Sequence, residues 1–359
     1  MDIVGCSRQT TAVTQISTTS PCSSTSGDPR LIALDWGTTS ARAYLLDDTG
    51  RILRTGPAGR GILTVTERAT SAEDHCAAFE EEFERMCGSW LDEHPEMPVL
   101  ASGMVGSNQG WVDVPYQRLP KNLTSLADAL VEVPSQRGRV HIVPGLLDDG
   151  ELPQVMRGEE TQILGVLERT AAVDGGDGPT ERVIVLPGTH TKWVRVQGVD
   201  VVDFLTSMTG EIYGLLTQHS ILAHLASQPE APDLGAFDRG VQTSLETGPE
   251  GGILASLFTA RTLPLTGRMP AEQVNDYISG LMIGAEVASC VASWLSTGFD
   301  TPSAQVLLCG EPELCRRYQR TLQQFDVDAL VVAGDVVTHG LWRIALSAGL
   351  LEHQLKGKA

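Results

Sequence analysis

Hydrophobic residues cluster in short β-rich runs separated by glycine-containing turns in the first folded part of the chain. The run at 31–34 enters a Gly-Thr-Thr-Ser turn at 37–40, a second run follows at 41–46, and Asp-Asp-Thr-Gly at 47–50 turns the chain again. Runs of this length, bounded by turn residues, predict strands. We therefore expect a strand–turn–strand–turn–strand unit in residues 31–54.

The same unit recurs in the second half of the chain. Residues 183–186 enter a Pro-Gly-Thr turn, residues 191–196 leave it, Gln-Gly-Val-Asp at 197–200 turns again, and residues 201–204 form a third run. Hairpins with Gly-Thr turns are common singly, but the matched order and spacing favour two similar domains. We predict an α/β protein with two domains, each a mixed sheet with helices.

Two polar stretches set the expected domain limits. Residues 1–29 are rich in serine and threonine and lack periodic apolar positions, so we expect a disordered tail. Asp-Gly-Gly-Asp-Gly-Pro at 174–179 predicts a boundary loop. The expected domains are residues 30–178 and 179–359, which agrees with the size of a chain of 359 residues.

The most hydrophobic helical segment, residues 277–294, carries Glu286 near its middle and a stripe of apolar residues at helical spacing. We interpret it as a buried core helix, not a membrane span. Gly280 and Gly284 on this helix suit close packing, either within the chain or in a homodimer.

A formal net charge of -19 argues against nucleic acid or an anionic membrane as the partner. An anionic ligand would need local cations or backbone amides to overcome that field. The seven cysteines are odd in number and form no C-x-x-C pair, which suits reduced thiols. Because the tail also lacks the apolar segment of a secretory signal, we expect a cytoplasmic protein.

Both Gly-Thr turns contain the parts of a phosphate-binding loop, although neither is a Walker A motif. Glycine lets backbone amides approach phosphate oxygens, and the hydroxyls add donors. Two such turns facing each other across a cleft would hold a triphosphate from both sides. The expected phosphate-binding residues are Gly37, Thr38, Thr39 and Ser40 in the first turn, and Gly188, Thr189, His190, Thr191 and Lys192 in the second.

Charged residues flank these turns. Asp35 precedes the first turn and could hold Mg²⁺ through water. Arg42 and Lys192 are the nearest candidate cations. Leu186 and Pro187 precede the second turn, so Asp35 is the only carboxylate directly before either turn.

Paired turns of this kind resemble the two phosphate motifs of the actin/hexokinase/Hsp70-like ATPase superfamily. A third stretch agrees, because a buried strand at 305–308 ends at a glycine and continues into a helix. It is similar to the superfamily's adenosine motif, although that motif often carries a second glycine where Glu311 stands here. The resemblance implies two actin-like domains around a nucleotide cleft, with ATP and Mg²⁺ between the turns and the adenosine beside Cys309, Gly310 and Glu311.

Longer strings narrow the resemblance. In chain order they are ASGMVGSNQGW from residue 101, VMRGEETQ from 155, PGTHTKW from 187, MTGE from 208 and SGLMIGAEV from 279. From about residue 31 to about residue 350 the chain resembles the 2-dehydro-3-deoxygalactonokinase family. That resemblance implies ATP-dependent phosphorylation of the 6-hydroxyl of 2-dehydro-3-deoxy-D-galactonate, in galactonate or galactose catabolism.

The resemblance also suggests which group accepts the hydroxyl proton. Related sugar kinases carry an acidic residue at a similar glycine-flanked helix start, one element before the second phosphate motif. Glu159 occupies that position here, and Glu160 follows it. We take Glu159 as the base and Glu160 as its alternative, because position along the chain does not separate them. The helix dipole alone also favours an acidic pair at a helix start.

The implied substrate is a carboxylate, so its site needs hydrogen-bond donors. Arg157 could pair with it bidentately, and the Gly-rich loop at 103–111 and Lys121 could contribute. Glu211, at another helix start, is either a cap or a hydroxyl acceptor. The expected substrate-binding residues are Gly106, Ser107, Asn108, Arg157 and Glu211.

Two alternatives stay open from the sequence. A kinase of another sugar or sugar acid in the same superfamily would share these motifs. So would a non-catalytic nucleotide-binding regulator, although the acidic pair and Asp35 argue against it. The choice between the galacto and gluco epimers depends on side-chain placement, which the sequence does not show.

Overall fold

The computed structural model describes residues 15–16, 27–67, 69–174, 181–227, 231–295 and 305–351. The first of two seven-stranded sheets is built from β2 (Pro29–Trp36), β3 (Ser40–Asp47), β4 (Ile52–Thr55), β5 (Gly59–Arg60), β6 (Val99–Ser102), β9 (Val131–Ser135) and β10 (Gly138–Ile142). Its order is β4-β3-β2-β6-β10-β9, with β5 paired to β3.

The second seven-stranded sheet is built from β1 (Gln15–Ile16), β8 (Lys121–Asn122), β13 (Glu181–Leu186), β14 (Thr191–Gln197), β15 (Asp200–Ser207), β16 (Gln305–Leu308) and β17 (Ala329–Val332). Its order is β1-β17-β16-β13-β14-β15-β8. A three-stranded sheet contains β7 (Gln117–Arg118), β11 (Leu146–Asp148) and β12 (Gln154–Met156).

Both large sheets contain the same core of strands. In the first, β2, β3 and β4 are antiparallel neighbours, and β6 and β10 continue the sheet in parallel beyond β2. In the second, β13, β14 and β15 are antiparallel neighbours, and β16 and β17 continue in parallel beyond β13. The duplicated unit predicted from the sequence is therefore confirmed, and so is the expected α/β fold of two actin-like units with mixed sheets.

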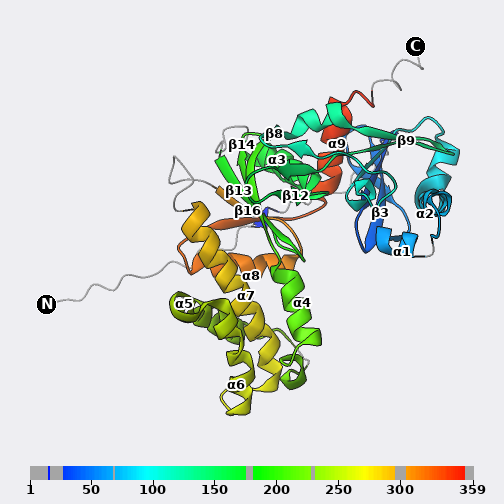
Figure 1. Cartoon of the computed structure of the whole chain (residues 1–359). Helices are drawn as coiled ribbons and strands as arrows, with labels where there is room; N and C mark the ends of the chain where they lie inside the picture. Colours follow the sequence, from blue (N-terminus) through cyan, green and yellow to red (C-terminus); the bar gives the residue numbers. More distant parts are fainter. Residues whose placement is uncertain are drawn as a thin grey trace.

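Helices pack between the sheets and on their outer faces (Figure 1). The helices α3 (Glu159–Asp174) and α9 (Val336–Ser347) lie between the sheets. The outer face of the first sheet is covered by α2 (Ala72–Glu93). The outer face of the second sheet is covered by α7 (Val274–Cys290) and α8 (Pro312–Gln323). Alternation along β2 produces this layering, because Leu31 and Ala33 face α3 and α9 while Ile32, Leu34 and Trp36 face α2.

The inner core is continuous from one sheet to the other. Leu31 of β2, Leu164 of α3, Leu341 of α9 and Ile184 of β13 all belong to one cluster and are all 0% exposed. The two helices therefore join the two sheets into one packed body.

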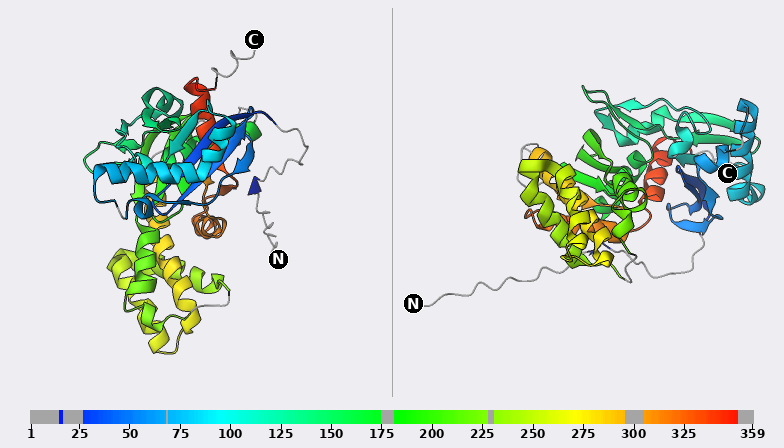
Figure 2. Two further views of the ribbon diagram at one scale, coloured as in Figure 1. Left: turned by 90° about the vertical axis from the view of Figure 1, so that its right-hand side faces the viewer. Right: turned by 60° about the horizontal axis from the view of Figure 1, so that its bottom comes forward.

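A helical extension projects from the second sheet (Figures 1 and 2). It contains α4 (Thr209–His219), α5 (Leu234–Leu257), α6 (Thr259–Leu265) and α7, around a small core of its own. A β-carbon at Gly280 of α7 would collide with the Phe237 carbonyl oxygen of α5, so this glycine face serves packing within the chain. Residues 271–295 are apolar and long enough to cross a membrane, but more than half of that span is buried in protein. The interpretation as a core helix is confirmed.

Two short strands cross the expected domain limits. β8, from the predicted first domain, pairs antiparallel with β15 of the second sheet, and Asn122 Nδ2 donates to Asp200 Oδ1 at 2.6 Å. β1, from the predicted tail, pairs in parallel with β17. A two-residue strand has no periodicity to reveal it, which is why the sequence misses both. The rest of residues 1–26, and residues 175–179 of the predicted boundary loop, lie outside the described residues.

Candidate active site

One cleft of about 380 Å³ brings the two Gly-Thr turns together. The first turn contributes Gly37 and Thr38, and the second contributes Gly188, Thr189 and His190. The cleft is also lined by Asp35, Gly103, Met104, Arg157, Gly158, Glu159, Gln162, Leu186, Pro187, Cys309 and Gly310. The two turns share one crevice, as a clasp around a single ligand requires.

The first turn is held by the short helix α1 (Ile62–Thr66). Ile62 N donates to Gly37 O at 3.1 Å, Leu63 N donates to Thr38 O at 3.3 Å, and Gly37 N donates to Ser40 O at 2.9 Å. These bonds fix the shape of the turn. Thr39 and Ser40, both predicted to bind phosphate, are exposed and lie outside the cleft lining.

The second turn is held by the first residues of α4. Glu211 N donates to Thr189 O at 2.9 Å, and a β-carbon at Gly210 would collide with the Gly188 carbonyl oxygen. The Glu211 carboxylate pairs with His190 Nε2 at the edge of the turn. Glu211, predicted as a substrate or capping residue, is therefore engaged with the turn itself.

The two residues after this turn point in opposite directions, as successive strand residues do. Thr191 is 0% exposed, and its hydroxyl hydrogen-bonds Tyr318 Oη at 2.9 Å, so its side chain lies behind the turn and outside the cleft lining. Lys192 is also buried, but its Nζ lies 3.6 Å from Glu159 Oε1. Only the lysine is directed toward the candidate base.

The structure separates the two acidic residues that the sequence left together. Glu159 lines the cleft, and its Oε2 accepts from Arg157 N at 3.0 Å. Glu160 is 0% exposed and lies outside the lining, where its Oε2 accepts from Gly158 N at 2.7 Å. Burial, with a smaller contribution from the Glu159 charge, raises the pKa of Glu160 to about 8. Position therefore favours Glu159 for contact with a ligand.

Arg157 is a buried cation, and some of its hydrogen-bond donors have no acceptor among the described residues. It is 7% exposed, its Nη2 donates to Val114 O at 2.7 Å, and its guanidinium lies 4.2 Å from the centroid of the Tyr116 ring. Its Nε and Nη1 find no hydrogen-bond partner among the described residues. A buried charged group with unmet donors is costly unless a ligand satisfies it. Arg157 also lines the cleft, so this site is suited to an anion.

Asp35 lies on the cleft wall at the end of β2. The pKa of Asp35 is raised, chiefly by burial. The charge of Arg42, opposite it in the β2–β3 register, opposes this shift, and the charge of Asp335 at the start of α9 adds to it. Ser102 pairs with Asp35 in the β2–β6 register, and its fully buried hydroxyl has no partner in the described part of the chain. A carboxylate beside an unsatisfied hydroxyl fits a hydrated Mg²⁺, which prefers few protein oxygen ligands.

The 103–111 loop contributes less directly than predicted. Gly106 approaches Arg157, since a β-carbon there would lie 3.1 Å from Arg157 Nη1. Ser107 is buried and its hydroxyl donates to Met104 O at 2.7 Å, whereas Asn108 is exposed. Neither side chain lines the cleft, although Gly103 and Met104 do. Lys121 Nζ donates to Gln117 Oε1 at 3.2 Å, also outside the lining.

The third predicted motif lies partly in the cleft. Cys309 and Gly310 line it, and burial raises the pKa of the Cys309 thiol to about 11, so it is not a thiolate nucleophile at neutral pH. Glu311 instead caps α8, where its Oε2 accepts from Leu314 N at 2.8 Å. The residue that departs from the two-glycine pattern therefore has a helix-capping role.

Sequence reasoning missed two features of the site. Gln162 lines the cleft one helical turn after Glu159, a position that the i, i+3 spacing could have suggested. A second, mostly apolar pocket of about 320 Å³ adjoins the cleft at Gly188 and Thr189. Its other lining residues are Thr209, Gly210, Tyr213, Ser279, Met282, Ile283, Leu314 and Tyr318. No local pattern predicts this pocket, because its walls come from three helices far apart in sequence.

Comparison with known proteins now identifies the family. The family model described as 2-keto-3-deoxy-galactonokinase matches residues 35–344, which include both turns, the Arg157–Glu159 segment and the third motif. The chain belongs to this family. It is accordingly a carbohydrate kinase, a transferase of carbohydrate metabolism with an actin-like ATPase fold.

Individual relatives of the kinase agree. It is 34% identical over 310 residues to the 2-dehydro-3-deoxygalactonokinase of Escherichia coli (strain K12), covering 85% of this chain and 94% of that protein. A Rhizobium meliloti (strain 1021) protein named a probable 2-dehydro-3-deoxygalactonokinase is 32% identical over 265 residues, covering 72% of this chain and 80% of that protein. A crystal structure provisionally described as a 2-dehydro-3-deoxygalactonokinase from Sinorhizobium meliloti superposes with a TM-score of 0.72 at 28% identity, covering 88% of this chain and 98% of that one.

Proposed function

We propose that the kinase transfers the γ-phosphoryl group of ATP to the 6-hydroxyl of 2-dehydro-3-deoxy-D-galactonate, giving the 6-phosphate and ADP. The product would enter galactonate or galactose catabolism. One observation supports this most strongly: the buried Arg157, with two nitrogens that lack acceptors among the described residues, lines the same cleft as Glu159 and both Gly-Thr turns. A sugar acid would satisfy the arginine while its far end faced the phosphates.

The nucleotide would lie across the cleft and the adjoining apolar pocket. Backbone amides of the two turns suit the phosphates, because no β-carbon keeps the oxygens away at Gly37 or Gly188. The apolar pocket that adjoins the cleft at Gly188 and Thr189 would receive the adenine ring against Met282 and Ile283. Gly310 lines the neighbouring cleft. ATP would thus run from the helical extension toward the first sheet.

Glu159 is our candidate for the catalytic base. Its carboxylate would accept the proton of the 6-hydroxyl as that oxygen forms a bond to the γ-phosphorus and the bond to the ADP oxygen breaks. The Arg157 amide and the Lys192 ammonium contact its two oxygens, at 3.0 Å and 3.6 Å, and so orient the group. Lys192 follows the second turn, but it is buried and does not line the cleft, so its contact with a phosphate stays a prediction.

Asp35 and Ser102 would hold hydrated Mg²⁺ beside the first turn, and the ion, when bound, would neutralise charge on the phosphates. Arg157 would hold the substrate carboxylate, and Gly106, which lacks a β-carbon, leaves room for the Arg157 guanidinium. The Tyr116 ring against the guanidinium keeps that arginine in place. These roles separate the anion-binding end of the substrate from its reacting hydroxyl.

An ADP-release assay tests the proposal directly. The purified kinase is given ATP, Mg²⁺ and, in turn, 2-dehydro-3-deoxy-D-galactonate, its gluco epimer, and a neutral hexose. We expect turnover with the galactonate derivative, and an Arg157→Gln variant should raise its KM about 10- to 100-fold. Preference for the neutral hexose would indicate another sugar kinase, and ATP binding without any phosphorylated product would indicate a regulator.

A further inference from the structure

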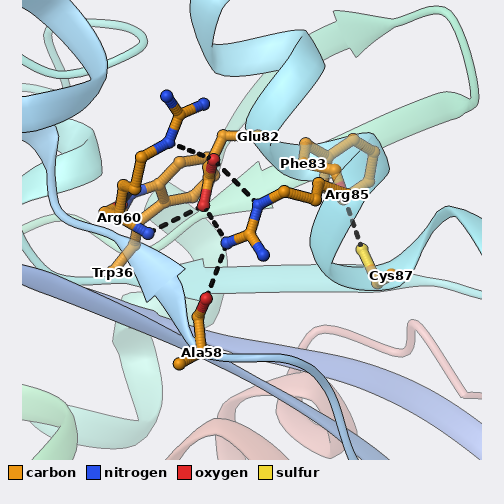
Figure 3. Close-up of polar contacts among 7 residues, drawn as sticks. All are labelled: Trp36, Ala58, Arg60, Glu82, Phe83, Arg85 and Cys87. Atoms are coloured by element: carbon orange, nitrogen blue, oxygen red, sulfur yellow. Dashed lines mark hydrogen bonds and ion pairs between the residues drawn. The ribbon is translucent and has the colours of Figure 1, made fainter.

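A buried carboxylate lies in the middle of α2, outside the cleft. Glu82 is 0% exposed, and its two oxygens accept four hydrogen bonds (Figure 3). Arg60 contributes its backbone N and its Nε, both at 2.7 Å, and Arg85 contributes its Nε at 3.2 Å and its Nη2. Two arginines around one fully buried acid form a charge-assisted cluster that a helix does not need for its own stability.

The cluster fixes the segment that precedes α1. Arg85 Nη2 also donates to Ala58 O at 2.7 Å, and Trp36 Nε1 donates to Arg60 O at 3.0 Å. In the β3–β5 register Arg60 faces Ser40. Residues 58–60 therefore contact α2 through Glu82 and Arg85. They also contact Trp36 and Ser40, which lie at the two ends of the first turn.

That segment in turn supports the first turn. It leads directly into Gly61, where a β-carbon would collide with the backbone of Thr38. The next two amides, Ile62 N and Leu63 N, donate to the carbonyls of Gly37 and Thr38. A shift of residues 58–61 would therefore move the turn, because the two backbones are in direct contact.

We propose that Glu82 is a positioning residue for the first phosphate turn, acting through Arg60, Gly61 and the start of α1. This inference rests on the proposed function only in that the turn binds nucleotide phosphate. It does not depend on which sugar acid is the acceptor. Arg157 is held by other contacts, to Val114 and Tyr116, so the two ends of the site should respond differently to loss of Glu82.

The experiment compares Glu82→Gln with Glu84→Gln in the full chain. The first change keeps the shape of the side chain but removes the charge that holds two arginines. Glu84 lies on the same helix and pairs with the partly exposed Arg137, so its variant makes the same change away from the segment. For Glu82→Gln we expect the KM for ATP to rise about 10- to 100-fold while the KM for the sugar acid stays within about twofold. Glu84→Gln should change neither.

Nucleotide affinity is measured separately, by calorimetry with a non-hydrolysable ATP analogue and Mg²⁺ but no sugar. Weaker binding to Glu82→Gln than to Glu84→Gln supports the inference even if the acceptor proves to be another sugar. Unchanged nucleotide affinity with a lower melting temperature would show a purely structural role and overturn it. A wild-type chain that binds no nucleotide would overturn the proposed function and this inference together.

A milder variant guards against failure of Glu82→Gln to fold. Arg85→Gln removes the outer half of the cluster and leaves the Glu82–Arg60 contacts in place. The Arg85 side chain is 41% exposed, so its replacement leaves no large cavity. We expect a smaller rise in the KM for ATP, about two- to fivefold, again without an effect on the sugar acid. Equal changes in both KM values would contradict the inference.

Discussion

Glu159 and Glu160 are neighbours in the chain but occupy different surroundings. Glu159 lines the cleft, whereas Glu160 is fully buried at the start of α3 and lies outside the cleft lining. Successive helical residues are rotated by about 100° from each other, so the side chains of an adjacent pair point in different directions. The sequence shows that an acidic pair starts a helix, and only the direction of that helix shows which member lines the cleft.

This difference predicts unequal effects of substitution. Glu159→Gln should lower kcat about 10²- to 10⁴-fold, because an amide cannot take the hydroxyl proton. Glu160→Gln should leave kcat within about threefold, since it remains outside the cleft. Steady-state kinetics of both variants at saturating ATP provides the measurement. A near-normal rate for Glu159→Gln with a slow Glu160→Gln would move the base to Glu160, and near-normal rates for both would remove the base from this segment.

Glu160 should also make stability depend on pH. Its pKa is raised from 4.5 to about 8 in the folded chain, chiefly by burial. Between those values the folded state holds a proton that the unfolded state has released, so rising pH favours unfolding. Stability from this group is complete below the unfolded pKa and lost as the pH rises through the folded one. Glu160→Gln mimics the protonated form and should lack this decline.

The check is a melting-temperature series from about pH 5 to about pH 8 for wild type and variant. The difference between the two proteins should shift in favour of Glu160→Gln as the pH rises. A constant difference across the series would mean that Glu160 titrates normally in the folded kinase.

At the scale of elements, what the sequence reveals depends on whether a pattern is local. The strands around both turns were predictable because their β-rich runs lie between Gly-Thr and Asp-Gly turns. Strand alternation could have shown that the side chains of Thr191 and Lys192 point in opposite directions, whereas the motif alone led us to expect both at the phosphates. The apolar pocket was not predictable, since Tyr213, Met282 and Leu314 come together only through the packing of α4, α7 and α8.

The contact between α4 and the second turn gives a matched pair of glycine substitutions. Gly210→Ala would drive a methyl group into the Gly188 carbonyl, so it should displace the turn, raise the KM for ATP and lower the melting temperature. Gly214→Ala is on the same helix, where a β-carbon would meet no atom of the described residues within 4 Å. It should stabilise the chain by about 0.5–1 kcal/mol and leave the KM unchanged.

Thermal melting and ATP kinetics of the two variants are sufficient to decide. If Gly210→Ala behaved like Gly214→Ala, the turn would not depend on the close approach of α4.

At the scale of the molecule, the duplicated sheets share their interior. Leu341 of α9 is 0% exposed in a cluster that includes residues of both sheets. We expect Leu341→Ala to cost about 2–5 kcal/mol and to shift one cooperative unfolding transition. Differential scanning calorimetry of wild type and variant would show this as a single endotherm moving to lower temperature. Two endotherms, with only one of them shifted, would mean that the units unfold independently.

The exchange of β8 and α9 across the duplication has a practical consequence for dissection of this protein. A gene cut between α3 and β13 would leave the first fragment with a strand whose partner, β15, is on the second fragment. The second fragment would carry α9 without the first sheet that it covers. Neither fragment should therefore fold when it is expressed alone, even though the repeat in the sequence makes this boundary the obvious place to divide the chain.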